Sequence, residues 1–228
     1  HNKLKYKINY CQFTTDIKKG KIPIGLIEKN TTNFLTIKGH NENKLITLPI
    51  FLTKDFAEFL GYIMGDGNIR KNYVQISNED LEIVNRIREL SKLLFNIEPS
   101  IKKAKRTKNM YDIRLCSGTL VKTMSIFDLK PGKKGKNLSI PNQILKSNDE
   151  TIIQFIRAYF DCDSYPSKNR DIELTSESQI LIQQTSMILQ RLGICSTISK
   201  KIINNIPYWR LSIKSRYAEK YAEKIGYL

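Results

Sequence analysis

The chain carries the stretch T-K-D-F-A-E-F-L-G-Y-I-M-G-D-G at residues 53–67, and a second stretch of similar pattern, D-E-T-I-I-Q-F-I-R-A-Y-F-D-C-D-S, at residues 149–164. A residue suited to cap a helix opens each stretch, Thr53 in the first and Asn148 just before the second. Apolar residues then recur at helical spacing in both. Small residues also recur four positions apart: Gly61 and Gly65 in the first stretch, Ala158 and Cys162 in the second. This pattern predicts two helices whose backbones can approach closely.

The last turn of each predicted helix is its most informative part. The first helix ends in Asp66 followed by Gly67, and the second ends in Asp163 followed by Ser164. A helix C-terminus carries partial negative charge, so an aspartate there costs about 0.3–1 kcal/mol. If the helices pack side by side, both carboxylates meet at one end, where they repel each other unless a cation lies between them. The pattern therefore predicts a cation site; the alternative is two ordinary core helices that happen to end in aspartate.

Residues 59–67, F-L-G-Y-I-M-G-D-G, and residues 156–164, I-R-A-Y-F-D-C-D-S, both resemble the nine-residue signature of the LAGLIDADG homing endonucleases. Two copies in one chain correspond to the single-chain, pseudo-symmetric form of that family. The resemblance implies an α+β fold of two pseudo-symmetric αββαββα half-domains, whose antiparallel sheets form a saddle over DNA. Two positions depart from the pattern. The sixth residue is Met64 in one copy and Asp161 in the other, and Ser164 replaces the final glycine.

Sliding the chain on itself supports two matching halves. Residues 74–80 align with 172–178, residues 83–94 with 181–192, and residues 111–115 with 208–212. Each half has the pattern of helix, two strands, helix, two strands, helix. We therefore predict a first half-domain with its linker at residues 51–146 and a second half-domain at residues 147–228. Residues 1–50 alternate short apolar runs with polar turns, which predicts a small β-rich N-terminal extension.

The composition favours a nucleic acid as partner. Thirty-eight Lys and Arg residues against 22 Asp and Glu give a net charge of +16, which is typical of proteins that bind a polyanion. No apolar run approaches the roughly 18–20 residues of a membrane span, and no signal peptide opens the chain. We expect a cytoplasmic protein that binds double-stranded DNA and no membrane, with an organellar location left open.

The composition also limits the catalytic metal. The four cysteines form no C-x-x-C pair, and the chain has only two histidines. A catalytic metal must then be a hard cation with oxygen ligands, which indicates Mg²⁺. We expect Mn²⁺ to substitute for it, and Ca²⁺ to bind without supporting cleavage.

The candidate catalytic residues begin with Asp66 and Asp163 as metal ligands, because a carboxylate pair holding Mg²⁺ lowers the pKa of bound water. By resemblance, the main-chain carbonyls of Gly65 and Cys162 also face the metal. The polar residue that this family carries near each site maps to Asn78 and Ser176, which either position water or simply cap the following helices. A lysine that the family places beyond the last helix maps to Lys134 in the first half, although the segment around it also has the composition of a flexible linker. The second half ends before such a lysine, so either the two sites are chemically unequal or the native chain continues beyond Leu228.

The candidate DNA-binding residues are long polar or basic side chains on predicted outward strand positions and hairpin tips. They are Arg70, Lys71, Gln75, Lys102, Lys103, Lys105, Arg106 and Arg114 in the first half, and Lys168, Arg170, Lys200, Lys201, Arg210 and Lys214 in the second. A β-ribbon fits the major groove, where Arg or Lys reads guanine and Gln reads adenine. Most of the lysines are expected to contact only phosphate.

Together these features predict a site-specific double-strand DNA endonuclease, monomeric because two halves in one chain already close the pseudo-two-fold axis. Two alternatives use the same fold: an RNA maturase that assists intron splicing, and a non-cutting DNA-binding regulator. The intact aspartate pair favours the nuclease. The chain begins with His1 and ends with Leu228, without the residues that a complete intein needs at its ends. It is therefore expected to be a free-standing, intron-encoded or intein-derived endonuclease.

Overall fold

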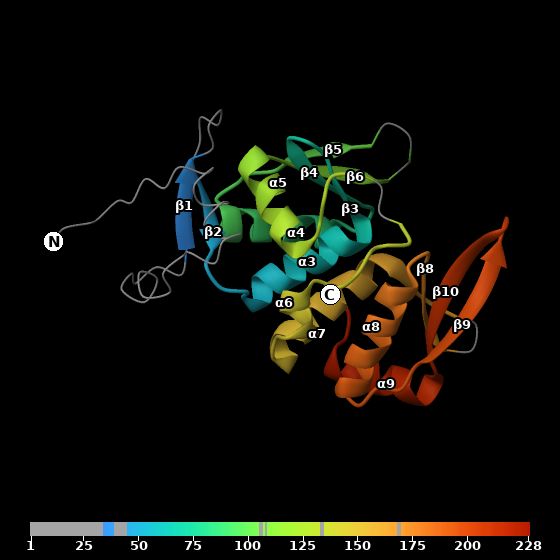
Figure 1. Cartoon of the computed structure of the whole chain (residues 1–228). Coiled ribbons are helices and arrows are strands. Elements are labelled where there is room, and N and C mark those ends of the chain that lie inside the picture. Colours follow the sequence, from blue (N-terminus) through green and yellow to red (C-terminus); the bar gives the residue numbers. More distant parts are fainter. Residues whose placement is uncertain (1–33, 39–44, 105–106, 108, 133–134, 168–169) are drawn as a thin grey trace.

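The computed structural model describes residues 34–38, 45–104, 107, 109–132, 135–167 and 170–228. Two four-stranded antiparallel sheets, each covered by helices, form two halves that meet along a central pair of helices (Figure 1). Within the described part of the chain, no helix combines the length and the apolar character needed to cross a membrane.

The two halves have the same element order. The first contains α3 (Lys54–Asp66), β3 (Gly67–Ile69), β4 (Tyr73–Asn78), α4 (Leu81–Phe95), β5 (Ser100–Lys103), β6 (Tyr111–Cys116) and α5 (Gly118–Met124). The second contains α7 (Asp149–Asp163), β7 (Ser164–Pro166), β8 (Ile172–Ser176), α8 (Gln179–Arg191), β9 (Thr197–Ile203), β10 (Ile206–Ile213) and α9 (Ser215–Lys224). A short 3-10 helix, η1 (Ser125–Phe127), and α6 (Asn142–Leu145) lie between them. The strand orders, β3-β4-β6-β5 and β7-β8-β10-β9, are equivalent, which confirms the predicted α+β fold of two pseudo-symmetric halves.

The sheets follow the predicted alternation. In the first half, Val74 and Ile76 of β4 are fully buried under the helices, while Gln75 between them is partly exposed. In the second half, Leu174 of β8 and Leu211 of β10 are fully buried in the same way. Because side chains alternate along a strand, each sheet has one apolar face in the core and one polar face turned away from the helices.

Helices α3 and α7 pack directly against each other at the centre of the molecule. Their predicted caps are confirmed: the Thr53 side chain accepts from the Phe56 N–H at 3.2 Å, and the Asn148 side chain accepts from the Thr151 N–H at 3.0 Å. Both helices end at an aspartate, Asp66 in α3 and Asp163 in α7, where the following residue, Gly67 or Ser164, turns to extended backbone.

The described part of the N-terminal extension is a two-stranded hairpin, β1 (Phe34–Lys38) and β2 (Leu45–Pro49). Ile46 and Leu48 of β2 are buried, and the Thr47 hydroxyl donates to the Leu94 carbonyl of α4 at 3.0 Å. The hairpin therefore packs against the first half. The rest of the predicted extension, residues 1–33 and 39–44, lies outside the described residues.

Candidate active site and DNA interface

Asp66 and Asp163 are the last residues of α3 and α7, as the sequence predicted. The two helices pack closely near these ends, because a Cβ built on Gly65 would lie 2.3 Å from the Cβ of Cys162. One turn earlier, a Cβ on Gly61 would lie 2.8 Å from the Cβ of Ala158. The small residues four positions apart therefore create the contact that brings the two helix ends together.

The residue after each aspartate adopts extended backbone, with φ of −77° at Gly67 and −91° at Ser164. Neither position needs a positive φ, so Ser164 replaces the glycine of the motif without backbone strain. Its hydroxyl donates to the Phe160 carbonyl at 2.7 Å, and this hydrogen bond stabilises the C-terminal end of α7.

The charges of Asp66 and Asp163 both affect the pKa of one neighbouring side chain, Cys162. Burial and the nearby carboxylates of Asp66 and Asp163 raise the pKa of the Cys162 thiol well above its usual range. The two negative charges therefore lie at the same end of the helix pair. Two neighbouring carboxylates are donors that suit a hard divalent cation. Across the described residues, no group of three or more His, Cys, Asp or Glu side chains is arranged to hold a metal.

Asn78 connects the first aspartate to the following helix. Its Nδ2 donates to Asp66 Oδ2 at 2.7 Å, and its Oδ1 accepts from the Asp80 N–H at 2.8 Å. Asp80 is the N-cap of α4, with its own carboxylate accepting from the Glu82 N–H at 2.8 Å. Asn78 thus contacts both Asp66 and Asp80, the residue that caps α4, without being the cap itself. Its predicted role in positioning water stays a prediction.

Ser176 occupies the equivalent place in the second half. Its hydroxyl accepts from the N–H of Ser178, the N-cap of α8, at 3.1 Å. A serine side chain is shorter than that of Asn78, and a cleft of about 210 Å³ lies beside it.

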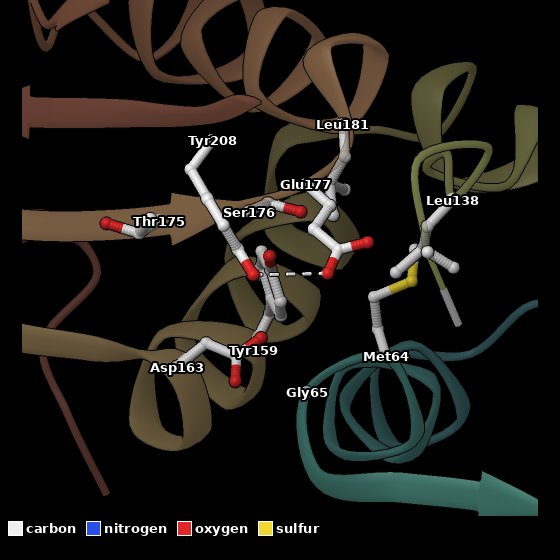
Figure 2. A pocket seen from close by; sticks show the side chains of 11 residues that line it. Met64, Gly65, Leu138, Tyr159, Asp163, Thr175, Ser176, Glu177, Leu181 and Tyr208 are labelled. Carbon is white, nitrogen blue, oxygen red and sulfur yellow. Dashed lines mark hydrogen bonds between the residues drawn. The ribbon is translucent and has the colours of Figure 1, made fainter. Parts of the chain in front are cut away.

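This cleft contains the second aspartate (Figure 2). Asp163 and Tyr159 of α7 line one side, and Ser176, Glu177 and Tyr208 line the other. The Tyr208 hydroxyl donates to Glu177 Oε1 at 3.3 Å. Burial and a hydrogen bond to the Asp163 carboxylate raise the pKa of the Tyr159 phenol well above its usual value, so this phenol stays protonated as a donor.

The sequence reasoning did not select Tyr159, Glu177 or Tyr208 as site residues. Tyr159 could have been found, because it lies one helical turn before Asp163. Glu177 directly follows Ser176, but nothing local marked its carboxylate. Tyr208 reaches the site only because β10 pairs with β8.

The polar face of the first sheet carries a connected network. Arg114 Nε donates to Gln75 Oε1 at 2.8 Å, and Gln75 Nε2 donates to Asp112 Oδ1 at 3.0 Å. Lys102 lies on this face too, because it pairs with Asp112 across β5 and β6. These side chains are held in place before any partner binds, with Asp112 as an acceptor that the sequence reasoning did not select.

The polar face of the second sheet has a similar arrangement. Arg210 NH1 lies 3.2 Å from Glu173 Oε2, which also accepts from the Tyr165 hydroxyl at 2.7 Å. Lys201 shares this face, since it lies opposite Tyr208 in the β9–β10 ladder.

Strand alternation places two of the predicted DNA-binding lysines on the opposite faces. Lys103 pairs with Tyr111, and its Nζ lies 5.9 Å from the centre of that ring. Lys200 pairs with Trp209, and its Nζ lies 5.7 Å from the centre of the indole. Both lie on the helix-facing side of their sheets.

The remaining candidates lie at turns, at a helix start or outside the described residues. Arg70 and Lys71 are exposed in the β3–β4 turn, and Arg170 lies in the β7–β8 turn with φ of 61°. Lys214 Nζ lies 2.8 Å from Oδ2 of the buried Asp171, whose Oδ1 accepts from the N–H that begins α9. Lys214 therefore helps to fix α9. Lys105, Arg106, Lys134 and Lys168 lie outside the described residues.

The fold and the paired aspartates define a single-chain protein with two LAGLIDADG motifs. The LAGLIDADG-like domain model matches residues 53–124 and 150–226, and the chain belongs to that family.

Two curated relatives share most of this chain. A component of the A-type ATP synthase of Pyrococcus abyssi is 35% identical over 184 residues, covering 80% of this chain and 18% of the relative. The Rpo1C component of the DNA-directed RNA polymerase of Methanocaldococcus jannaschii is 32% identical over 185 residues, covering 81% and 21%. The chain thus spans about a fifth of the length of these relatives.

Solved structures with this fold include the homing endonuclease I-DmoI and the protein DUF199/WhiA. The crystal structure of I-DmoI in complex with DNA and Mn has a TM-score of 0.58 at 18% identity, covering 77% of this chain and 97% of that one. Full-length DUF199/WhiA from Thermatoga maritima has a TM-score of 0.55 at 17% identity, covering 77% and 56%. At these identities the likeness establishes the shared fold.

Proposed function

We propose that this chain is a site-specific double-strand DNA endonuclease that hydrolyses one phosphodiester in each strand with the help of Mg²⁺. The observation that carries the proposal is the meeting of Asp66 and Asp163 at one end of the α3–α7 pair. Two carboxylates side by side at helix C-termini oppose both the helix dipole and each other. A divalent cation bound there offsets both penalties. A purely structural role for the two aspartates would leave both penalties in place.

The roles of the protein's own groups follow from their positions. Asp66 and Asp163 would hold the cation, with the backbone of Gly65 and Cys162 beside them. Bound there, the cation neutralises charge on the phosphate and lowers the pKa of water. Asn78 fixes the orientation of the Asp66 carboxylate through its 2.7 Å hydrogen bond. Mn²⁺ is proposed as a substitute and Ca²⁺ as a cation that binds without supporting cleavage; related I-DmoI complexes are described with Mn and with Ca.

The polar faces of the two sheets are proposed to bind the DNA. Arg114 and Gln75 in the first half, and Arg210 in the second, are pre-oriented side chains of the types that read guanine and adenine in the major groove. Lys102 and Lys201 lie on the same faces and suit contacts with phosphate. One chain supplies both halves, so the monomer is the proposed functional form.

The relatives suggest that such a domain lies within a longer host protein. The ATP synthase and RNA polymerase components have unrelated names, yet each shares a segment of about 185 residues with this chain. A segment common to unrelated proteins is more simply an insert with its own activity than a part of either host's machinery. We therefore propose that this endonuclease is of the kind inserted within host proteins, in the manner of an intein.

The test is metal-dependent cleavage of a plasmid library that carries randomised long target sites. The expected result is specific linearisation by the wild type in Mg²⁺ but not in Ca²⁺, with loss of cutting and retention of DNA binding in Asp66→Asn and Asp163→Asn. Asp128→Asn is the matched control, because Asp128 is an exposed aspartate with φ of 58° that asparagine tolerates. A wild type that binds DNA tightly without cutting would instead support the regulator, and one that prefers structured RNA would support the maturase.

A further inference from the structure

The two ends of the aspartate pair have different surroundings. In the strand ladders Asn78 lies opposite Tyr111, and Ser176 lies opposite Trp209, so these are equivalent positions. The ladders therefore match residues 111–115 with 209–213, one residue later than the alignment with 208–212 that the sequence suggested. The residues equivalent to Glu177 and Tyr208 are then Glu79 and Met110. In the first half, the Asn78 amide reaches Asp66 directly and Glu79 is exposed. In the second half, the shorter Ser176 lies beside a cleft where Glu177 and Tyr208 are partly buried.

The carboxylate of Glu177 is held at the wall of this cleft. Figure 2 shows Glu177 and Tyr208 pointing toward each other across the end of β8, with Asp163 on the facing side. The Tyr208 hydroxyl donates to Glu177 Oε1 at 3.3 Å. Desolvation and the charge of Glu177 raise the pKa of the Tyr208 phenol, which keeps it protonated and therefore a donor. The hydrogen bond to Oε1 thus orients the Glu177 carboxylate. Because the carboxylate is a rigid planar group, its other oxygen, Oε2, is oriented with it.

The cleft has the size and lining of a water site next to a reaction centre. Its volume of about 210 Å³ has room for several ordered waters. The hydroxyls of Ser176 and Thr175 line it together with the carboxylates of Asp163 and Glu177. A carboxylate within hydrogen-bonding reach of a nucleophilic water accepts its proton in the transition state, which typically contributes 10²–10⁴-fold to the rate.

We propose that Glu177, oriented by Tyr208, receives the proton of the attacking water for the one DNA strand that is cut beside Asp163. The proposal rests on the proposed endonuclease function. In the step, the water oxygen bonds to phosphorus while the ester bond from phosphorus to the departing nucleotide oxygen breaks. The proton of the water passes to Glu177, and the departing oxygen takes up a proton from solvent. The strand cut beside Asp66 does not use this carboxylate.

The experiment measures single-turnover cleavage of a duplex target whose two strands carry different labels. In Glu177→Gln, the rate on one strand is expected to fall at least about 100-fold, with the rate on the other strand and the affinity for DNA unchanged, so that nicked duplex accumulates. Tyr208→Phe should slow the same strand by a smaller factor, about 10-fold. Glu177→Asp, which keeps the charge, should recover part of the loss.

Glu79→Gln is the matched control, since Glu79 is the equivalent and exposed residue of the first half; it should cut both strands at the wild-type rate. Equal slowing of both strands in Glu177→Gln, or no slowing, would overturn the proposal while leaving the endonuclease function intact. A wild type that cuts neither strand would overturn both. An unchanged unfolding midpoint for Glu177→Gln confirms that a rate change does not come from loss of fold.

Discussion

Replacing Gly65 by alanine tests whether the contact between α3 and α7 positions the site. An added Cβ would lie 2.3 Å from Cys162 Cβ and 3.1 Å from its Sγ, well inside van der Waals contact. The helices must then move apart, and overpacking of this kind costs about 1–3 kcal/mol. Alanine returns up to about 1 kcal/mol through its higher helix propensity. With an overpacking cost near 2 kcal/mol, Gly65→Ala is therefore expected to lower the free energy of unfolding by about 1 kcal/mol, measured by urea denaturation.

Moving the small residue to the other helix should reverse most of this loss. Cys162→Gly removes both atoms that the new Cβ would meet, which leaves the Tyr159 carbonyl at 3.6 Å as its nearest neighbour. Alone, Cys162→Gly should cost about 1 kcal/mol, because glycine weakens a helix. The double variant should be more stable than the sum of the two single losses by roughly 2 kcal/mol, a coupling of the size expected for residues in contact.

A stable Gly65→Ala protein, or strictly additive losses in the double variant, would refute the argument that this contact holds the two helix ends together. Cleavage gives a second reading of the same contact. If the distance between Asp66 and Asp163 depends on it, Gly65→Ala should lose cutting in the folded protein, and the double variant should regain part of it.

Three further predictions concern charge. Lys102→Ala is expected to reduce the slope of log K against log salt for DNA binding by about 0.9, whereas Lys103→Ala on the opposite face should leave it unchanged; equal effects would contradict the assignment of faces. Arg86→Met should lower the free energy of unfolding by about 3 kcal/mol. The reason is that it removes two hydrogen bonds, at 3.0 and 2.7 Å, from the buried Glu58 carboxylate. A loss below about 1 kcal/mol in urea titration would show that the Arg86–Glu58 pair does not stabilise the fold. Burial raises the pKa of Asp161 to about 6, so the folded state holds this proton more tightly than the unfolded chain, and stability should fall as pH rises from about 4 to about 6. With metal chelated, thermal unfolding of Asp161→Asn should lack this fall, and a profile identical to that of the wild type would contradict it.

The sequence alone determined the architecture of the protein. Helix caps, periodicity and the position of small residues are local patterns, and two copies of them in one chain already indicated paired helices ending in Asp66 and Asp163. The alternation of Val74 and Ile76 with Gln75 likewise indicated which side of the sheet is buried. These predictions were correct because each depends on spacing along one element.

The tertiary structure decided which side chains share a site. The face of a lysine depends on strand register, so Lys102 and Lys103 differ although both are basic residues in one short strand. Asp161 is half-buried, and the Leu228 N–H of the C-terminal segment, 67 residues away in the sequence, donates to its Oδ1 at 3.3 Å.

The same holds for the second site, where Tyr208 meets Glu177 across two strands and both line the cleft of Asp163. Sequence distance does not reveal such a meeting, because it is set by the pairing of β8 with β10 and by the packing of that sheet against α7. Short-range periodicity therefore determined the elements and the two aspartates. Long-range strand pairing and helix packing determined the surroundings of each aspartate, and through them the difference between the two ends of the pair.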